Sequence, residues 1–230
     1  MSKLSNDSSV FEANQYYPRT RWKRADSSMV YYGIAKRVLD MIGACLGLLV
    51  CLPLFIVLAI RIKLEDPKGH IFFYQQRVGK DEKVFNMYKL RSMVSNAEEL
   101  LDELLDQNEM EGHMFKMKED PRITKVGKFM RRTSMDELPQ LWNVLKGDMS
   151  LVGPRPPLLR EVEQYSAYHK QRLQVTPGCT GLWQVSGRND IGFEEMVELD
   201  LTYIRERKLS LEVIIIMRTF RALLGSKNAY

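Results

Sequence analysis

Residues 41–60 of this 230-residue chain read MIGACLGLLVCLPLFIVLAI, twenty consecutive positions without a charged side chain. At about 1.5 Å per residue, a helix of this length covers roughly 30 Å, the thickness of the hydrocarbon core of a bilayer. A buried helix of a soluble protein is the alternative, but a helix that is apolar on all sides is uncommon outside membranes. The stretch is too long and too far from the N-terminus for a signal peptide, and no small-residue cleavage site follows. We therefore predict that it inserts into a membrane.

Two features of this segment argue against a simple span. Pro53 lies inside it and frees the carbonyl of Leu49 from its helical hydrogen bond, so a sharp bend is expected. Lysine and arginine also flank the segment on both sides, whereas the positive-inside rule leaves one side poor in them. A segment that enters the membrane, turns at Pro53 and returns to the same face satisfies both observations. We predict a re-entrant helix-break-helix over residues 34–64.

The composition of the chain indicates an anionic partner. Lysine and arginine number 34 against 29 aspartates and glutamates, a formal net charge of +5. Such a charge suits nucleic acid, lipid head groups or a phosphorylated substrate. The three cysteines have no metal-ligand spacing, and the three histidines form no HExxH motif. Both Gly-Lys pairs lack the Ser or Thr of a P-loop, so the sequence matches none of these common classes.

The remaining sequence divides around the apolar segment. Residues 1–33 are polar, carry a basic cluster and lack sustained periodicity, which predicts a flexible basic tail. Residues 65–230 have the character of a soluble domain, and 70–93 predict a hairpin that turns at GKDEK. Helices are expected at 96–110, 136–146, 158–172, 193–208 and 209–224, the last as a core or interfacial amphipathic helix. The predicted fold class is α/β, mostly helical, with one short β element.

The stretch RRTSMDELPQL, residues 131–141, sets Asp136 and Glu137 behind two arginines and ahead of Pro139. As structure, Asp136 is a good N-cap residue, and Glu137 in the first turn suits the helix dipole. As chemistry, the two carboxylates form a reaction centre. These eleven residues alone favour the capping interpretation, and other parts of the chain have to decide between the two.

Four further stretches carry groups that suit a phosphorylated substrate. Lys89 and Arg91, two residues apart, would point to one face of a strand. Residues 118–132 place a run of basic side chains just ahead of the acidic pair. Arg155 lies between prolines that stiffen the backbone, and an ordered guanidinium can bind phosphate through two donors. Residues 176–190 form a glycine-punctuated loop. Each stretch also has a plain explanation, as a strand edge, a surface charge run, a rigid linker or a set of turns.

Together these stretches are recognisable. KLRSM, DPRITKVG, TSMDELPQLWNVLKGDMSLVGPRP and PGCTGLWQVSGRN, in this order behind one proline-broken apolar segment, resemble the bacterial sugar transferase family. Its members are monotopic phosphoglycosyl transferases, also called polyprenyl-phosphate hexose-1-phosphate transferases. The resemblance runs from about Lys36 to the C-terminus. It implies a re-entrant helix in the bacterial inner membrane and a catalytic domain on the cytoplasmic face.

The resemblance also implies an activity and a cofactor. A hexose-1-phosphate would pass from a UDP-sugar to undecaprenyl phosphate with release of UMP, in the presence of Mg²⁺. This reaction is the first membrane step of exopolysaccharide, capsule or glycan biosynthesis. The acidic stretch 96–110 followed by MFKMKEDPRIT resembles the hexose-transferring relatives, which favours UDP-galactose or UDP-glucose. No nucleic-acid partner is expected. The oligomeric state stays open, a homodimer included.

The resemblance assigns the dyad of the family to Asp136 and Glu137. Asp136 would attack the β-phosphorus to form a phosphosugar–aspartyl intermediate, and Glu137, with Asp136, would hold Mg²⁺. The neighbouring arginines predict that Asp136 is ionised at neutral pH, as a nucleophile must be. The residues assigned to phosphate and substrate binding are Lys89, Arg91, Arg131, Arg155, Gly187, Arg188 and Asn189.

Two alternatives to this mechanism remain open. In one, transfer is direct within a ternary complex and Asp136 acts as general base. In the other, the chain is a non-enzymatic membrane adaptor whose basic face binds anionic lipid or a partner protein. Release of UMP from a UDP-sugar without lipid acceptor, in an amount matching the enzyme, is expected only of the two-step mechanism.

Overall fold

The computed structural model describes residues 27–97, 99–100, 117, 120–187 and 191–225. The helix predicted for 96–110 falls almost entirely outside the described residues, as do Arg188, Asn189 and most of the predicted tail.

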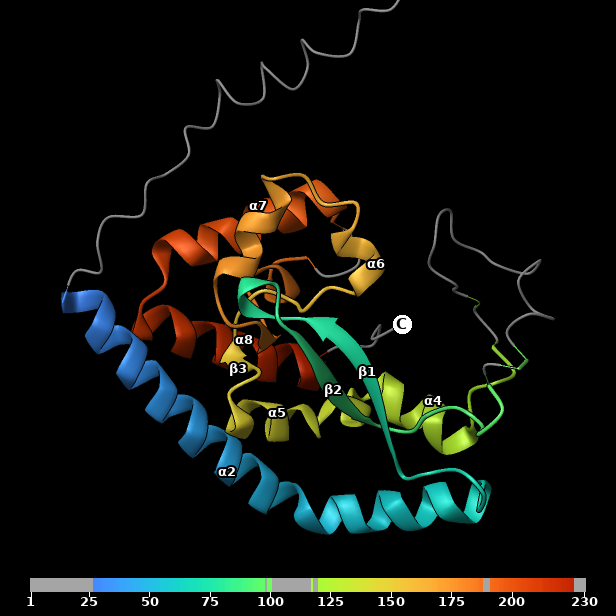
Figure 1. Cartoon of the computed structure of the whole chain (residues 1–230). Coiled ribbons are helices and arrows are strands. Elements are labelled where there is room, and N and C mark those ends of the chain that lie inside the picture. Colours follow the sequence, from blue (N-terminus) through green and yellow to red (C-terminus); the bar gives the residue numbers. More distant parts are fainter. Residues whose placement is uncertain (1–26, 98, 101–116, 118–119, 188–190, 226–230) are drawn as a thin grey trace, which may run out of the picture.

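The longest element is α2, Ser27–Glu65, which wraps around one side of the other elements (Figure 1). It starts within the stretch 1–33 that the sequence assigns to the tail. Pro53 lies inside α2, which remains one continuous helix and changes direction in its middle. The predicted break is therefore a bend. Proline removes one backbone hydrogen bond and opens the helix on one side, while the neighbouring turns keep their own bonds.

The predicted hairpin is confirmed. β1 (Phe72–Val78) pairs antiparallel with β2 (Val84–Leu90), and Asp81 and Glu82 take positive φ in the turn between them. The register sets Arg77 opposite Phe85, so alternate residues of both strands share one face. A second, parallel pair joins β3 (Ser150–Val152) to β4 (Gly178–Thr180).

The helices of the domain agree with the sequence in part. α7 (Phe193–Glu206) and α8 (Leu209–Gly225) lie where they are predicted. The single helix predicted for 158–172 is wrong: α6 covers only Leu159–Val162, and a 3₁₀ helix covers His169–Gln174. Ser166 explains the interruption, because its hydroxyl accepts a hydrogen bond from the backbone N–H of His169 and starts the new turn.

The helix that follows the acidic pair starts later than predicted. α4 (Lys125–Arg132) leads to a 3₁₀ turn, Met135–Glu137, and α5 then covers Gln140–Lys146. Ser134 takes a left-handed backbone, so the N–H groups of the next residues bond to carbonyls three positions back rather than four. Asp136 therefore lies inside the 3₁₀ turn and does not cap α5. The end of α5 at Gly147 is confirmed, with a left-handed backbone at φ 92°.

One side of α2 is buried against the domain. Ala44 packs with Val144 of α5, and farther along the helix Leu58 packs with Leu90 and Met130. Gly43 and Gly47 permit the close approach, because a Cβ at these positions would lie 2.6 Å from Leu151 Cδ1 and 2.9 Å from Leu141 Cδ1.

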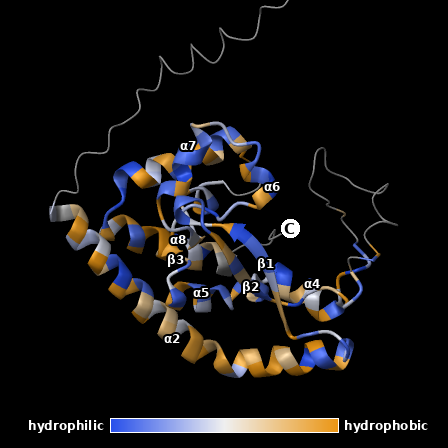
Figure 2. Ribbon diagram, viewed as in Figure 1, coloured by the Kyte–Doolittle hydropathy of each residue, from blue (hydrophilic) through white to orange (hydrophobic). Residues whose placement is uncertain are grey.

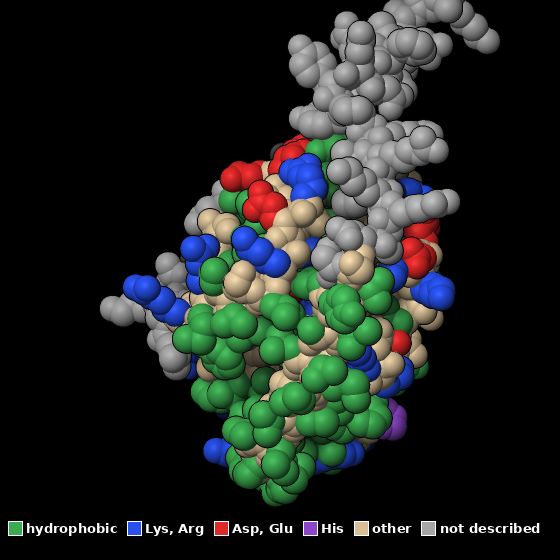
Figure 3. Space-filling view, turned by 90° about the vertical axis from the view of Figure 1, so that its left-hand side faces the viewer, with side chains coloured by type: hydrophobic (Ala, Val, Ile, Leu, Met, Phe, Trp, Pro, Cys, Tyr) green, Lys and Arg blue, Asp and Glu red, His purple; other side chains and the backbone are tan. Residues whose placement is uncertain are grey.

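The opposite side of α2 exposes apolar side chains. Figure 2 shows that most of this helix consists of hydrophobic residues. From Met29 to Glu65 the helix is long and apolar enough to cross a membrane by length and composition. Apolar side chains gather on the face that α2 presents in Figure 3. The exposed apolar residues of α2 include Ile42, Leu46, Leu49, Val50, Leu52, Ile56, Val57 and Ile60.

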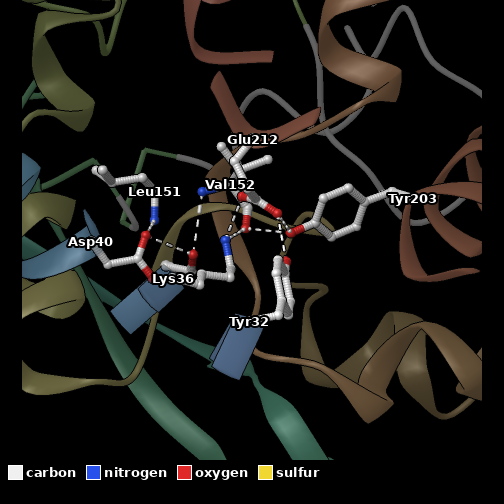
Figure 4. A network of polar contacts seen from close by, with 8 residues as sticks. Tyr32, Lys36, Asp40, Leu151, Val152, Tyr203 and Glu212 are labelled. Atoms are coloured by element: carbon white, nitrogen blue, oxygen red, sulfur yellow. Dashed lines mark hydrogen bonds and ion pairs between the residues drawn. The ribbon is translucent and has the colours of Figure 1, made fainter. Parts of the chain in front are cut away.

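Polar contacts tie the N-terminal end of α2 to α8 and β3 (Figure 4). Glu212, fully buried, pairs with Lys36 at 2.5 Å and accepts hydrogen bonds from the hydroxyls of Tyr32 at 2.6 Å and Tyr203 at 2.8 Å. Lys36 also donates to the carbonyl of Val152 at 3.0 Å. The buried carboxylate is therefore fully engaged by one cation and two hydroxyls.

Further contacts hold α2 against the two helices around the acidic pair. Arg37 donates to the carbonyls of Val144 and Leu145 at 2.6 and 2.8 Å, which satisfies the last turn of α5. At the other end of α2, Glu65 accepts from the backbone N–H groups of Lys125 and Val126 at 2.6 and 2.9 Å, which caps α4. Both ends of α2 are thus bound to the same domain.

We expect Glu212→Gln to destabilise the folded protein by about 3 kcal/mol, because it leaves the Lys36 ammonium in a largely buried place without a counter-charge. Thermal and denaturant unfolding in detergent micelles measures the loss. Lys36→Met in the same background removes the unpaired charge and should recover part of the stability. Exposed Glu163→Gln is the matched control and should change little. Additive losses in the double variant would show that the ion pair does not couple these residues.

Candidate active site

A cavity of about 860 Å³ lies between the β1–β2 hairpin, the 3₁₀ turn at Met135–Glu137 and the Pro-rich segment around Arg155. Asp136 and Glu137 both line it. Four of the basic residues assigned from the sequence also line it: Lys89, Arg91, Arg131 and Arg155. Gly187 is not among the lining residues. The dyad and these basic residues, which are spread over residues 89–155 of the sequence, therefore meet in one place.

The hairpin supplies one wall of the cavity, mainly through one face, and Leu90 adds to it from the end of β2. Phe73 and Gln75 of β1, and Met87 and Lys89 of β2, line the cavity and follow the alternation of the strands. This placement confirms that Lys89 points with a strand face toward the site. The turn at GKDEK fixes the register that makes this face continuous.

Asp136 is buried, with 7% of its surface exposed. Burial raises the pKa of this carboxyl above its ordinary value; Lys89 and Arg131 act in the opposite direction but do not offset it, and Glu137 adds to the rise. The sequence expectation that Asp136 is ionised rested on a helix start and the neighbouring arginines, and it did not include the effect of burial. The turn places the carboxyl deeper than a helix N-cap would.

The pKa of Glu137 shifts in the opposite direction to that of Asp136. Burial favours its neutral form, but the charge of Lys89 and a hydrogen bond from Lys89 Nζ at 2.7 Å outweigh it, so the pKa of Glu137 lies below its ordinary value. Arg155 and Arg77 act in the same direction as Lys89. Two adjacent carboxyls whose pKa values move apart are suited to different roles.

The basic residues of the cavity differ in the hydrogen bonds and ion pairs that they form with other residues. Arg131 donates from Nε to Ser92 Oγ at 2.9 Å. Arg155 is half-buried between two buried prolines. Arg91 pairs with Asp66 and donates to the carbonyl of His70 at 2.5 Å, so its guanidinium also joins the end of α2 to β2. The phosphate-binding roles assigned to these residues stay predictions.

Among the residues of the cavity that sequence reasoning missed is a buried basic residue, Arg77. This arginine is 6% exposed and lines the cavity next to Arg155. Nη1 donates to the carbonyl of Pro156 at 3.1 Å and Nη2 to Gln75 Oε1 at 2.7 Å. The signal was present in the alternation of FFYQQRV, which puts Arg77 on the same strand face as Gln75.

The carboxylates offer an incomplete set of metal ligands. Within the described part of the chain, no group of three or more His, Cys, Asp or Glu side chains could hold a metal ion. Asp136 and Glu137 are two oxygen donors of the kind that Mg²⁺ takes. Mg²⁺ commonly binds one or two carboxylates and completes its shell with substrate phosphate and water, so the dyad fits such an ion only together with a phosphorylated substrate.

The fold and the cavity thus define a membrane-associated protein with a basic site around a carboxylate pair. Comparison with known families gives the particular family: the profile of the bacterial sugar transferases matches residues 31–226. The chain belongs to this family, which confirms the resemblance drawn from the sequence.

Three relatives illustrate the similarity. The chain is 51% identical over 197 residues to the galactosyl transferase CpsE of Streptococcus agalactiae, covering 85% of this chain and 43% of the relative. It is 44% identical over 200 residues to an undecaprenyl-phosphate galactose phosphotransferase of Salmonella typhimurium, covering 85% of this chain and 41% of the relative. It is 37% identical over 202 residues to the exopolysaccharide production protein ExoY of Rhizobium meliloti, covering 86% and 89%. The chain therefore spans less than half the length of the first two.

We expect Asp136→Asn to raise the thermal unfolding midpoint at pH 7. The pKa of Asp136 is raised in the folded protein, so the wild type loses stability as the pH rises through that folded pKa, whereas asparagine does not titrate. The advantage of the variant should shrink as the pH falls toward 4, near the pKa of an unfolded aspartate. Unfolding curves of both proteins across this range measure the difference. A less stable variant at pH 7 would mean that the carboxylate makes favourable contacts that an amide cannot replace.

Proposed function

We propose that this chain is a phosphoglycosyl transferase that moves a hexose-1-phosphate from a UDP-sugar to undecaprenyl phosphate and releases UMP. The observation that carries the proposal is the dyad itself, two adjacent carboxyls with pKa values shifted in opposite directions in a basic cavity beside an apolar helix. The names of the relatives support the same class of reaction, since one is an undecaprenyl-phosphate galactose phosphotransferase.

In the proposed mechanism, the carboxylate of Asp136 attacks the β-phosphorus of the UDP-sugar. A bond forms between the carboxylate oxygen and phosphorus, and the bond from phosphorus to the bridging oxygen breaks, so UMP leaves with that electron pair. A phosphate oxygen of undecaprenyl phosphate then attacks the same phosphorus and displaces Asp136. Lys89, Arg131 and Arg155 would stabilise the phosphoryl charge as it moves. Covalent catalysis replaces one difficult displacement by two easier ones.

The burial of Asp136 suits this role. A carboxylate with few water molecules around it is a more reactive nucleophile, and a site closed to water protects the acyl phosphate from hydrolysis. Lys89 and Arg131 favour the ionised form that the attack requires, against the effect of burial. Glu137, which is held ionised by Lys89, would hold Mg²⁺ through its second oxygen, with Asp136 nearby. When bound, Mg²⁺ would offset negative charge on the diphosphate.

The contacts of α2 support a re-entrant arrangement. Its N-terminal end binds the domain through Lys36, and its C-terminal end binds the same domain through Glu65. A straight span would put these ends on opposite faces of a bilayer, whereas both ends contact one domain here, which supports a re-entrant arrangement. We therefore place the exposed apolar surface of α2 in the inner membrane and the domain on its cytoplasmic face. α8 adds exposed apolar side chains at Val213, Ile214, Met217 and Phe220, as an interfacial helix would.

The names of the relatives support a choice of sugar and pathway to test. Relatives named for galactose include the Salmonella typhimurium and Streptococcus agalactiae proteins, and one from Erwinia amylovora is a UDP-galactose-lipid carrier transferase. We therefore take UDP-galactose as the first donor to test, followed by UDP-glucose. The product would feed the assembly of an exopolysaccharide or capsule.

We expect purified protein with Mg²⁺ and UDP-galactose, but no lipid acceptor, to release a burst of UMP that approaches one molecule per enzyme. Asp136→Asn should remove the burst and the turnover while the protein stays folded. Quenched-flow measurement of UMP gives both quantities. UMP that forms only after undecaprenyl phosphate is added would support the ternary-complex mechanism. No UMP from any UDP-hexose, with or without acceptor, would contradict an enzymatic function.

We expect single cysteines at Tyr31 and Lys83, on either side of the apolar segment, to lie on the same side of the membrane. Both positions are exposed, and the background would lack native Cys45, Cys51 and Cys179. An impermeant maleimide should label neither site in intact cells and both after permeabilisation. Labelling of one site alone in intact cells would show that α2 spans the bilayer.

A further inference from the structure

Arg77 differs from the other buried arginines in its partners. The structure describes four arginines with less than 9% of their surface exposed, and three of them form an ion pair with a carboxylate. These pairs are Arg91 with Asp66, Arg122 with Asp120 and Arg172 with Asp200. Arg77 has no carboxylate within ion-pair distance among the described residues, and its two hydrogen bonds go to neutral oxygens of Pro156 and Gln75.

A buried guanidinium without a counter-charge is unfavourable, since arginine stays charged in proteins. The Nε of Arg77 is buried and has no hydrogen-bond partner within the described residues. A second cation, Arg155, lies close by, and burial followed by the charge of Arg155 lowers the pKa of Arg77 to about 10. Both arginines line the cavity, so two cationic side chains lie together in its wall, and Glu161 and Glu137 act on Arg77 without an ion-pair contact.

An anion that pairs with Arg77 could bind in the cavity that Asp136 and Glu137 line, because Arg77 and Arg155 line the same cavity. The two arginines act on Glu137, whereas Arg131 acts on Asp136 and Lys89 acts on both carboxyls. Among the largest charge effects, those of Arg77 and Arg155 fall on Glu137 and that of Arg131 falls on Asp136, and the hydrogen bond from Arg77 to the carbonyl of Pro156 places Arg77 beside Arg155. A diphosphate carries two phosphate groups, and this division offers a separate cationic site for each.

We propose that Arg77 is a substrate-binding residue which, with Arg155, forms a phosphate subsite on the Glu137 side of the dyad. This inference rests on the proposed function and deepens it. Because Asp136 attacks the β-phosphorus, the subsite beside Glu137 receives the other phosphate, which leaves with UMP. The hydrogen bonds to Pro156 and Gln75 aim the guanidinium and leave its remaining donors for the ligand.

The test measures binding of UDP and of uridine to purified protein by calorimetry, without any turnover. We expect Arg77→Lys to weaken UDP binding by about tenfold or more, since lysine lacks the planar fork of donors, and to leave uridine binding within about twofold. Exposed Arg160→Lys is the matched control and should alter neither ligand. The KM for the UDP-sugar should rise in Arg77→Lys, while the KM for undecaprenyl phosphate stays the same.

Equal losses of UDP and uridine binding would overturn the proposal, because a purely structural role damages the whole site. Unchanged UDP binding would overturn it as well. Gln75→Glu provides a second test that does not remove Arg77: a carboxylate 2.7 Å from Nη2 should stabilise the fold and weaken UDP binding. Unchanged stability in this variant would contradict the idea that Arg77 lacks an anion. Absence of the acceptor-free UMP burst tests the proposed function separately, since UDP binding needs no transfer.

Discussion

The hydrogen bonds and ion pairs at the two ends of α2 set the geometry of the site. Arg37 satisfies the carbonyls that end α5, and Glu65 caps the N–H groups that begin α4. The turn that carries Asp136 lies between these two helices, so α2 holds it from both sides. A movement of α2 in the membrane would therefore shift α4 and α5 together. Each contact satisfies backbone groups at a helix end that have no partner within the helix. Separating α2 from α4 and α5 would therefore break several hydrogen bonds at once.

The site is built with an excess of cations around two carboxyls. Lys89 forms an ion pair with Glu137. Burial raises the pKa of Asp136, whereas the positive charges of Lys89 and Arg131 act to lower it. Arg77 and Arg155 add positive charge that no carboxylate of the described residues pairs with directly. A diphosphate bound here, as proposed, would relieve the repulsion between these cations. The unfavourable free energy of the unpaired charges would then contribute to the affinity for an anionic substrate.

Local patterns in the sequence predicted the parts of the fold that local interactions decide. The GKDEK turn and strand alternation predicted the hairpin, and Gly147 marked the end of α5. The start of α5 was not predictable, because the left-handed backbone of Ser134 depends on packing around the turn. The ion pair of Lys36 with Glu212 joins residues far apart in the chain. Lys36 is one of the basic residues that flank the apolar segment, and its ion pair could not be predicted from that position. The place of Arg77 in the cavity was missed as well: strand alternation puts it on the face of Gln75, but its contact with Pro156 joins segments far apart in the chain.

The glycines of α2 constrain how the helix can meet other molecules. A Gly-xxx-Gly pattern in an apolar helix commonly marks a surface where two helices pack closely. Here Leu151 and Leu141 of the same chain already pack against Gly43 and Gly47. Another helix could use this surface only after α2 left the domain, which would also break the contacts that hold α4 and α5. Lipid or a second copy of the chain must therefore approach α2 from its opposite, exposed side.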